Sequence, residues 1–211
     1  MEASEDRRVQ RTKTMLRSAL AVLMTKKTLR NITVRELTEM ADLNRATFYL
    51  HYRDVFDMQQ QIEDEVIREL DQIFRANQPR VVGLPSRCLF LAILQYVSTG
   101  TDVCQMLLGK NASRTFLDKL GEMVEKHYVT DWLHQYNIKD EDTRNISYLS
   151  GYMVYGYVAI VARWVEAGMQ EPPEEIAKMM QDIGLATFSY VQPDWILNPE
   201  YTLTTHDEDS K

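Results

Sequence analysis

Apolar residues recur at helical spacing along almost the whole chain. Between Arg7 and Lys27, for example, Leu16, Leu20 and Leu23 fall on one side of a helix. The same period predicts further helices at residues 33–41, 45–52, 56–76, 86–99, 102–108, 113–136, 143–167 and 174–191. The 8 glycines and 6 prolines are too few for a sandwich or barrel of many strands. The pattern therefore predicts an all-α protein.

The most complete start signal for a helix lies at Thr33. Thr33 and Glu36 have the spacing of a capping box, in which each side chain binds the backbone amide of the other residue. Ile32 and Leu37 stand where a hydrophobic staple would hold the chain at the helix entry. We therefore expect a firmly defined helix from residue 33 onwards.

Residues 33–52 have the proportions of a helix-turn-helix. About eight helical residues, a three-residue break at 42–44 and about eight further residues follow one another. Phe48 and Tyr52 share one face of the second helix, and no acidic residue lies on its outward side. The residues expected there are Arg45, Ala46, Thr47, Tyr49 and His51. Such side chains suit a recognition helix, although an ordinary pair of short bundle helices has the same proportions.

Charge is distributed unevenly along the chain. The net charge is −7, but residues 1–53 hold 11 Lys/Arg and 6 Asp/Glu, which gives +5. Residues 54–211 hold the other 13 basic and 25 acidic residues, which gives −12. The local electrostatic field, and not the net charge, decides whether a protein binds DNA. The basic residues 1–53 are therefore compatible with binding to nucleic acid, although residues 54–211 are acidic.

Other features bear on location in the cell. Cys88 and Cys104 are too few for a disulfide framework or a structural zinc site and fit a reducing cytosol. The first 14 residues contain no apolar signal region, so we expect a cytoplasmic protein. Residues 146–162 carry no charge, but two serines, two glycines and four tyrosines favour a buried or interface helix over a membrane span. Gly168 is expected to end that helix.

The segment NITVRELTEMADLNRATFYLHYRDVFDM resembles the DNA-binding domain of the tetracycline-repressor (TetR) family. The resemblance covers about residues 7–60 and is carried by Ile32, Thr33, Val34, Leu37, Ala41, Leu43 and residues 45–52. A weaker likeness to the ligand-binding domain of one subgroup spans 156–176. The resemblance implies an all-α homodimer with a three-helix head that binds a palindromic operator in double-stranded DNA. It also implies a helical body that dimerises and often holds a small-molecule inducer.

On this basis we divide the chain into three parts. Residues 1–54 form the predicted helix-turn-helix domain, and residues 55–192 form the ligand-binding and dimerisation domain. Residues 193–211 form a loose acidic tail.

Three positions depart from the family pattern. Asp42 replaces a common glycine of the turn, and we expect it to adopt left-handed geometry and to point away from DNA. Thr38 replaces a usual alanine, so we expect its hydroxyl to point outward. Val55 stands where the family often has a phosphate-binding lysine, which removes one DNA anchor.

The resemblance assigns DNA-contacting roles in the head. Arg45 is a candidate to read guanine, with a phosphate contact as the alternative. Thr47 and Tyr49 are expected to bind phosphates, Tyr49 also reaching a thymine methyl group, and His51 to contact phosphate or base. The full predicted surface is Arg7, Arg8, Arg11, Thr33, Arg45, Ala46, Thr47, Tyr49, His51 and Tyr52.

Two further sites are predicted in the body. Aromatic and methionine side chains are candidates for an inducer pocket, although many such residues form ordinary core. They are Phe90, Tyr96, Met106, Phe116, Met123, Tyr128, Trp132, Tyr152, Tyr155 and Trp164. Small and apolar residues of the last two long helices are candidates for the dimer interface. They are Tyr148, Gly151, Tyr152, Tyr155, Ala159, Ala162, Met179, Met180, Ile183 and Ala186.

Two other functions stand as alternatives. The same fold serves as a co-regulator that binds a protein partner through its body and has no inducer pocket. An enzyme is disfavoured, because no phosphate loop, nucleophile elbow or zinc-protease motif occurs. His127 and His134 share a helix face but lack a third ligand, so we expect no metal and no cofactor.

Overall fold

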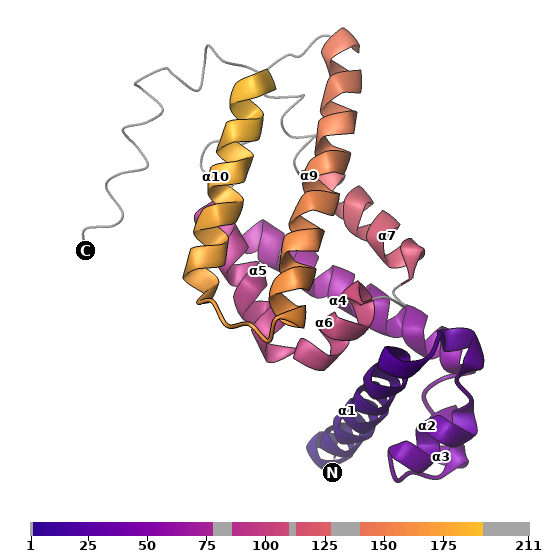
Figure 1. Ribbon diagram of the computed structural model, residues 1–211. Helices are drawn as coiled ribbons and strands as arrows, with labels where there is room; N and C mark the ends of the chain where they lie inside the picture. Colours follow the sequence, from indigo (N-terminus) through magenta and orange to yellow (C-terminus); the bar gives the residue numbers. More distant parts are fainter. Residues whose placement is uncertain (1, 78–85, 110–112, 128–139, 192–211) are drawn as a thin grey trace.

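The computed structural model describes residues 2–77, 86–109, 113–127 and 140–191. Within these ranges the chain is helical and has no β-strand, which confirms the all-α fold. In chain order the elements are α1 (Glu2–Lys26), the 3-10 turn η1 (Leu29–Asn31), α2 (Val34–Met40), α3 (Arg45–Tyr49), α4 (Val55–Ala76), α5 (Arg87–Thr99), α6 (Thr101–Leu108), α7 (Arg114–Glu125), α9 (Asp140–Glu166) and α10 (Pro173–Val191). Figure 1 shows α1–α3 gathered at one end as a head, α9 and α10 together in the body, and α4 running between these parts.

One apolar core holds the three helices of the head together. Leu16 and Leu20 of α1, Leu37 of α2 and Phe48 of α3 are all fully buried. Leu16 and Leu20 are four residues apart and therefore share one helix face. Burial of each such side chain contributes roughly 1.5–3 kcal/mol, which gives short α2 and α3 a stability that they would not have alone.

The head core continues along α4 into the body. Met58 and Ile62 of α4 belong to the same buried cluster as the head residues, and so do Met106 of α6 and Phe116 of α7. Helix α1 also packs directly against α6. The division proposed after residue 54 therefore coincides with the start of α4, but the two parts share one continuous core.

A second apolar core joins α5, α9 and α10. Leu94 of α5, Trp164 and Val165 of α9, and Ala177 and Met180 of α10 lie in it, each at most 3% exposed. Assigning Met180 to the dimer interface was therefore wrong, because this side chain faces the protomer's own core.

Helix α9 ends at the predicted place. Gly168 has a φ of 79° and Met169 a φ of 53°, so the chain reverses through two left-handed residues. The indole nitrogen of Trp164 donates to the Glu171 carbonyl at 2.9 Å and fixes the loop that leads to α10. None of the helices in the described ranges is long and apolar enough to cross a membrane.

Two predicted segments extend beyond the described ranges. The helix expected over residues 113–136 is observed as α7, and Tyr128, Trp132 and His134 lie outside the described residues. The predicted acidic tail, 193–211, also lies outside them.

Candidate nucleic-acid interface

The N-terminus of α2 forms the predicted capping box. The Thr33 hydroxyl accepts a hydrogen bond from the Glu36 amide at 3.2 Å, and the Glu36 carboxylate accepts one from the Thr33 amide at 3.1 Å. Lys27 donates to the same carboxylate at 2.6 Å, and this bond, with those from Thr33, lowers the pKa of Glu36 to about 2. Glu36 is thus ionised at neutral pH. A phosphate bound at Thr33 would share this helix end with the Glu36 carboxylate.

The turn between α2 and α3 has the expected left-handed residue. Asp42 has a φ of 52° and its side chain is exposed. The Leu43 amide donates to the Thr38 carbonyl at 2.9 Å, which closes the C-terminus of α2. Aspartate tolerates this backbone region better than most residues other than glycine, so the helix-turn-helix forms without the usual glycine.

The outward orientation expected for the Thr38 hydroxyl was wrong. Thr38 is 2% exposed, and its hydroxyl donates to the Val34 carbonyl at 2.8 Å and contacts the Arg35 carbonyl at 3.1 Å. A buried hydroxyl needs an acceptor, and the preceding turn of its own helix provides one. Thr38 therefore fits between α2 and α3 with its polar group satisfied.

Helix α3 presents one buried and one exposed side. Asn44 caps it by accepting from the Ala46 amide at 3.0 Å, and the fully buried Phe48 anchors it to the head. Most of the predicted contact residues lie in exposed or half-buried positions of α3 and of the turn that follows it. These are Arg45, Ala46, Thr47, Tyr49 and His51. The structure thus brings these five side chains together on one short helix and the turn that follows it.

Leu50 was missing from the predicted contact residues. Its side chain is 79% exposed, directly after the last residue of α3. Leucine side chains are usually buried, so the residue type alone did not indicate an exposed position. The place of Leu50 in the helix did, because residues two apart on a helix face nearly opposite directions and Phe48 is the buried anchor.

Tyr52, in contrast, is not an available DNA contact. It is 3% exposed, and its ring lies 5.5 Å from that of Phe48. Burial raises the pKa of Tyr52, although the nearby charge of Arg17 opposes the shift. Arg17 of α1 also forms an ion pair with Glu65 of α4. Tyr52 therefore belongs to the core that joins α1, the end of α3 and α4, and the prediction that it contacts DNA was wrong.

The basic residues of α1 lie at the same end of the molecule as the helix-turn-helix. Arg7, Arg8 and Arg11 are exposed on the first half of α1. Figure 1 places the N-terminus of α1 near α2 and α3. These cations can add to the positive field of the head without reading sequence.

The N-terminus of α4 is acidic and apolar in this chain. Asp54 caps it by accepting from the Asp57 amide at 2.8 Å. The Asp57 carboxylate binds the Arg53 amide at 2.9 Å and the Arg53 guanidinium at 3.0 Å, and the first of these bonds contributes most to lowering the pKa of Asp57. Val55, where the resemblance leads one to expect a lysine, is 4% exposed. This helix end therefore offers a phosphate no cation of its own at position 55 and two nearby carboxylates.

His51 lies half-buried in the turn that follows α3. Burial and the charge of Lys13 lower the pKa of His51, so the imidazole is neutral at pH 7. A neutral imidazole can donate or accept a hydrogen bond, whereas its protonated form would add a charge to the surface.

Polar contacts in the body hold α4 against α7. Glu63 is 3% exposed and accepts from the Gln59 amide group at 2.8 Å, and Lys119 of α7 lies 3.5 Å from the same residue. Near the other end of α4, His127 lies 2.6 Å from Asp71. These bonds tie the helix that leaves the head to the body.

The structure divides the predicted ligand-contacting residues that it describes between two apolar cores and the outer face of α9. Five of the eight that it describes are closed into the two apolar cores: Phe90, Met106, Phe116, Met123 and Trp164. Tyr96 is half-buried and its hydroxyl donates to Glu69 at 2.6 Å. Tyr152 and Tyr155 lie on the outer face of α9, 66% and 49% exposed.

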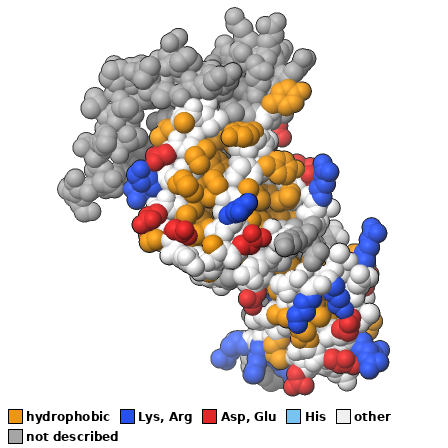
Figure 2. All heavy atoms as spheres, viewed as in Figure 1, with side chains coloured by type: hydrophobic (Ala, Val, Ile, Leu, Met, Phe, Trp, Pro, Cys, Tyr) orange, Lys and Arg blue, Asp and Glu red, His pale blue; other side chains and the backbone are white. Residues whose placement is uncertain are grey.

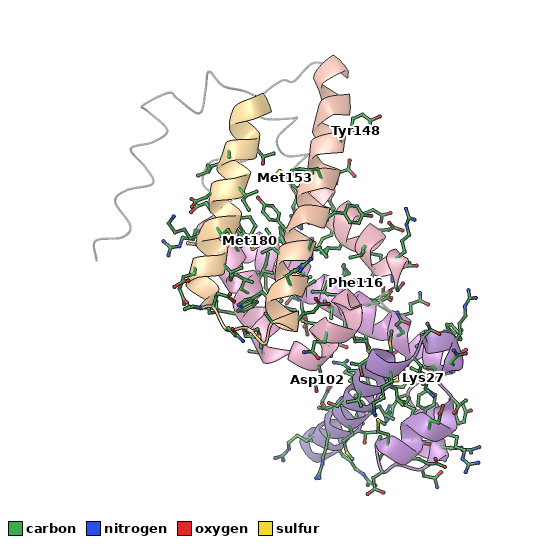
Figure 3. The ribbon with its side chains drawn as sticks, in the orientation of Figure 1. Lys27, Asp102, Phe116, Tyr148, Met153 and Met180 are labelled. Carbon is green, nitrogen blue, oxygen red and sulfur yellow. The ribbon has the colours of Figure 1, made fainter. Side chains whose placement is uncertain are left out.

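The predicted dimer surface is exposed and apolar. Large hydrophobic side chains gather on the outer sides of α9 and α10, as the hydrophobic atoms over the body in Figure 2 illustrate. They are Tyr148, Tyr152, Tyr155, Met179 and Ile183. Ala159 and Ala186 are exposed with them, whereas Gly151 and Ala162 are half-buried. In Figure 3, Tyr148 projects from α9 into solvent while Met180 points between α10 and α9.

Comparison with known proteins points to regulators of transcription. Residues 87–184 match the family model TetR_C_8, described as a transcriptional regulator C-terminal region. Over 179 residues the chain is 26% identical to an uncharacterized HTH-type transcriptional regulator, YxbF, of Bacillus subtilis (strain 168). The match covers 84% of this chain and 45% of that relative, so the chain spans about half its length.

Solved structures share the fold. The fatty acid degradation regulator FadR from Bacillus halodurans superposes with a TM-score of 0.62 at 14% identity, covering 82% of this chain and 94% of that one. A TetR transcriptional regulator from Streptococcus agalactiae 2603V gives 0.54 at 18% identity, covering 87% and 99%. At these identities the likeness concerns the arrangement of the helices alone.

Proposed function

Because the chain belongs to the TetR family of transcriptional regulators, we propose that it acts as a homodimer that binds a palindromic DNA operator and represses transcription. The observation that carries the proposal is the exposed side of α3. Arg45 and Tyr49 stand there with Thr47 and His51, without a carboxylate among them, on a helix anchored by Phe48. Such groups can bind phosphates and base edges in the major groove.

The apolar outer face of α9 and α10 supports the homodimer. Exposure of the tyrosine and methionine side chains on this face to water is unfavourable, and contact with a second copy would bury them. Aromatic residues contribute strongly to the binding free energy of interfaces. A two-fold interface uses the same patch on both copies, and small residues such as Ala159 allow two helices to approach closely. Two heads then reach successive major grooves about 34–36 Å apart.

The response to a small-molecule inducer stays a prediction. An inducer would act by favouring a state of the dimer with a different separation of the two heads. The contacts between α4 and α7, among them Lys119 with Asp64 at 2.6 Å, would have to rearrange or transmit such a change.

The proposal is tested by selection of the purified chain against random duplex DNA at two salt concentrations. We expect enrichment of one palindrome and binding that weakens with salt. The variant Arg45→Ala should keep the dimer and relax the preference at one position of each half-site. Weak binding without any enriched sequence would refute operator recognition and would favour the alternative of a co-regulator that acts through a protein partner.

A further inference from the structure

The most outward ridge of α3 is apolar. Leu50 has the highest exposure, 79%, among the exposed large hydrophobic side chains of the described residues. Leu50 keeps helical backbone angles, and its amide donates to the Ala46 carbonyl at 3.2 Å, so the helical register extends to it. Ala46 is exposed too.

The register sets the direction of these two residues. An α-helix turns about 100° per residue, so Ala46 and Leu50 each lie about 160–200° from Phe48, which is buried. They are four residues apart and therefore lie one above the other. A helix that enters a groove with its buried side away from the DNA presents this ridge first, with Arg45 and Tyr49 beside it.

The chemistry of the ridge restricts what it can recognise. Alanine and leucine offer only methyl and methylene groups, which form no hydrogen bonds. On the major-groove edges of the four bases the apolar group is the C5-methyl of thymine, and the other groups are hydrogen-bond donors and acceptors. A ridge without hydrogen-bonding groups thus gains free energy over thymine and loses it over a polar edge that it strips of water.

We propose that Leu50, supported by Ala46, reads the C5-methyl group of a thymine in each half-site of the operator. The inference rests on the proposed function, since it presumes that α3 enters the major groove. It makes Leu50 a residue that determines specificity, next to the hydrogen-bonding side chains of the same helix. The N-terminus of α4 carries Val55 and two carboxylates and offers no lysine for a phosphate contact. Base contacts such as that of Leu50 therefore contribute a larger share of the binding free energy.

The test removes single methyl groups from DNA. Starting from the selected palindrome, each thymine is replaced in turn by deoxyuridine, which lacks only the C5-methyl, and affinity is measured by fluorescence anisotropy with the full chain. We expect that replacement at one symmetric pair of positions lowers the affinity. The loss should be about fourfold for one half-site, the equivalent of one buried methyl group, and about 15-fold when both are replaced. Leu50→Ala should bind thymine and deoxyuridine at that pair alike.

A matched control separates this role from a general effect of losing an apolar side chain. Val22→Ala shortens an exposed residue, 43% exposed, on α1 and should leave the deoxyuridine effect unchanged. If no thymine is sensitive, or if the sensitivity persists in Leu50→Ala, the inference is overturned while palindrome binding upholds the proposed function. If no palindrome is enriched at all, both are overturned.

Discussion

Arg17 offers the sharpest test of how the head is fixed to α4. It joins α1 to Glu65 of α4, and the side chains of Arg17 and Glu65 are 25% and 33% exposed. Pairs on the surface contribute about 0–1 kcal/mol, whereas breaking a fully buried pair costs about 3–5 kcal/mol. At this partial burial we expect a coupling free energy of about 1–2 kcal/mol between Arg17 and Glu65.

The coupling is measured with a double-mutant cycle of Arg17→Met and Glu65→Met. Urea denaturation gives the free energies of unfolding of the four proteins in the cycle. One fixed protein concentration is used, because the stability of a dimer depends on concentration. The pair Arg35 and Glu39, whose side chains are 68% and 62% exposed on α2, is the matched control and should couple by less than about 0.5 kcal/mol. A coupling for Arg17 and Glu65 no larger than in this control would show that the pair does not fix α1 to α4.

Further predictions concern pH, the dimer and the turn. Because the pKa of His51 is lowered, the folded state binds the proton less well than the unfolded chain, so stability should fall as pH drops below about 6.5; operator affinity should rise over the same range, because protonation adds a positive charge. Calorimetry and anisotropy check the two trends, and a His51→Gln variant with the same pH dependence would exclude this residue as their source. Tyr152→Glu places a charge on the apolar face of α9 and should yield monomers in sedimentation analysis, with at least a tenfold loss of operator affinity. The exposed control Gln95→Glu should stay dimeric. A dimeric Tyr152→Glu would place the interface elsewhere. Asp42→Gly should raise the free energy of unfolding by up to about 1 kcal/mol, because glycine adopts the left-handed backbone without strain, and Asp42→Val should lower it by about 1–2 kcal/mol; equal denaturation midpoints for the two variants would contradict this.

Features set by neighbouring residues were predictable from the sequence. The capping box of Thr33 and Glu36, the left-handed Asp42 and the helix end at Gly168 all depend on residues a few positions apart. In each case the sequence contains the whole interaction, so its chemistry can be recognised without the fold.

Features that depend on distant segments were not predictable in this way. The ion pair of Arg17 with Glu65 joins residues 48 positions apart, and Tyr52 is buried in the core that α1 and α4 share with α3. The spacing of Tyr52 from Phe48 already indicated the core side, but a tyrosine next to a recognition helix also suits a phosphate contact. Met180 was assigned to the wrong side of α10, because both sides of that helix are apolar and only the packing of α5 and α9 decides which is buried.

Two copies of this chain are expected to read one palindrome through α3. This is tested most directly by titrating the full chain into the selected palindrome, a single half-site and a scrambled duplex of the same composition, at two salt concentrations. We predict two chains per palindrome and an affinity at least about 10³-fold tighter than for the scrambled duplex, with salt weakening both. Equal affinity for the palindrome and the scrambled duplex would show that α3 does not read the operator sequence.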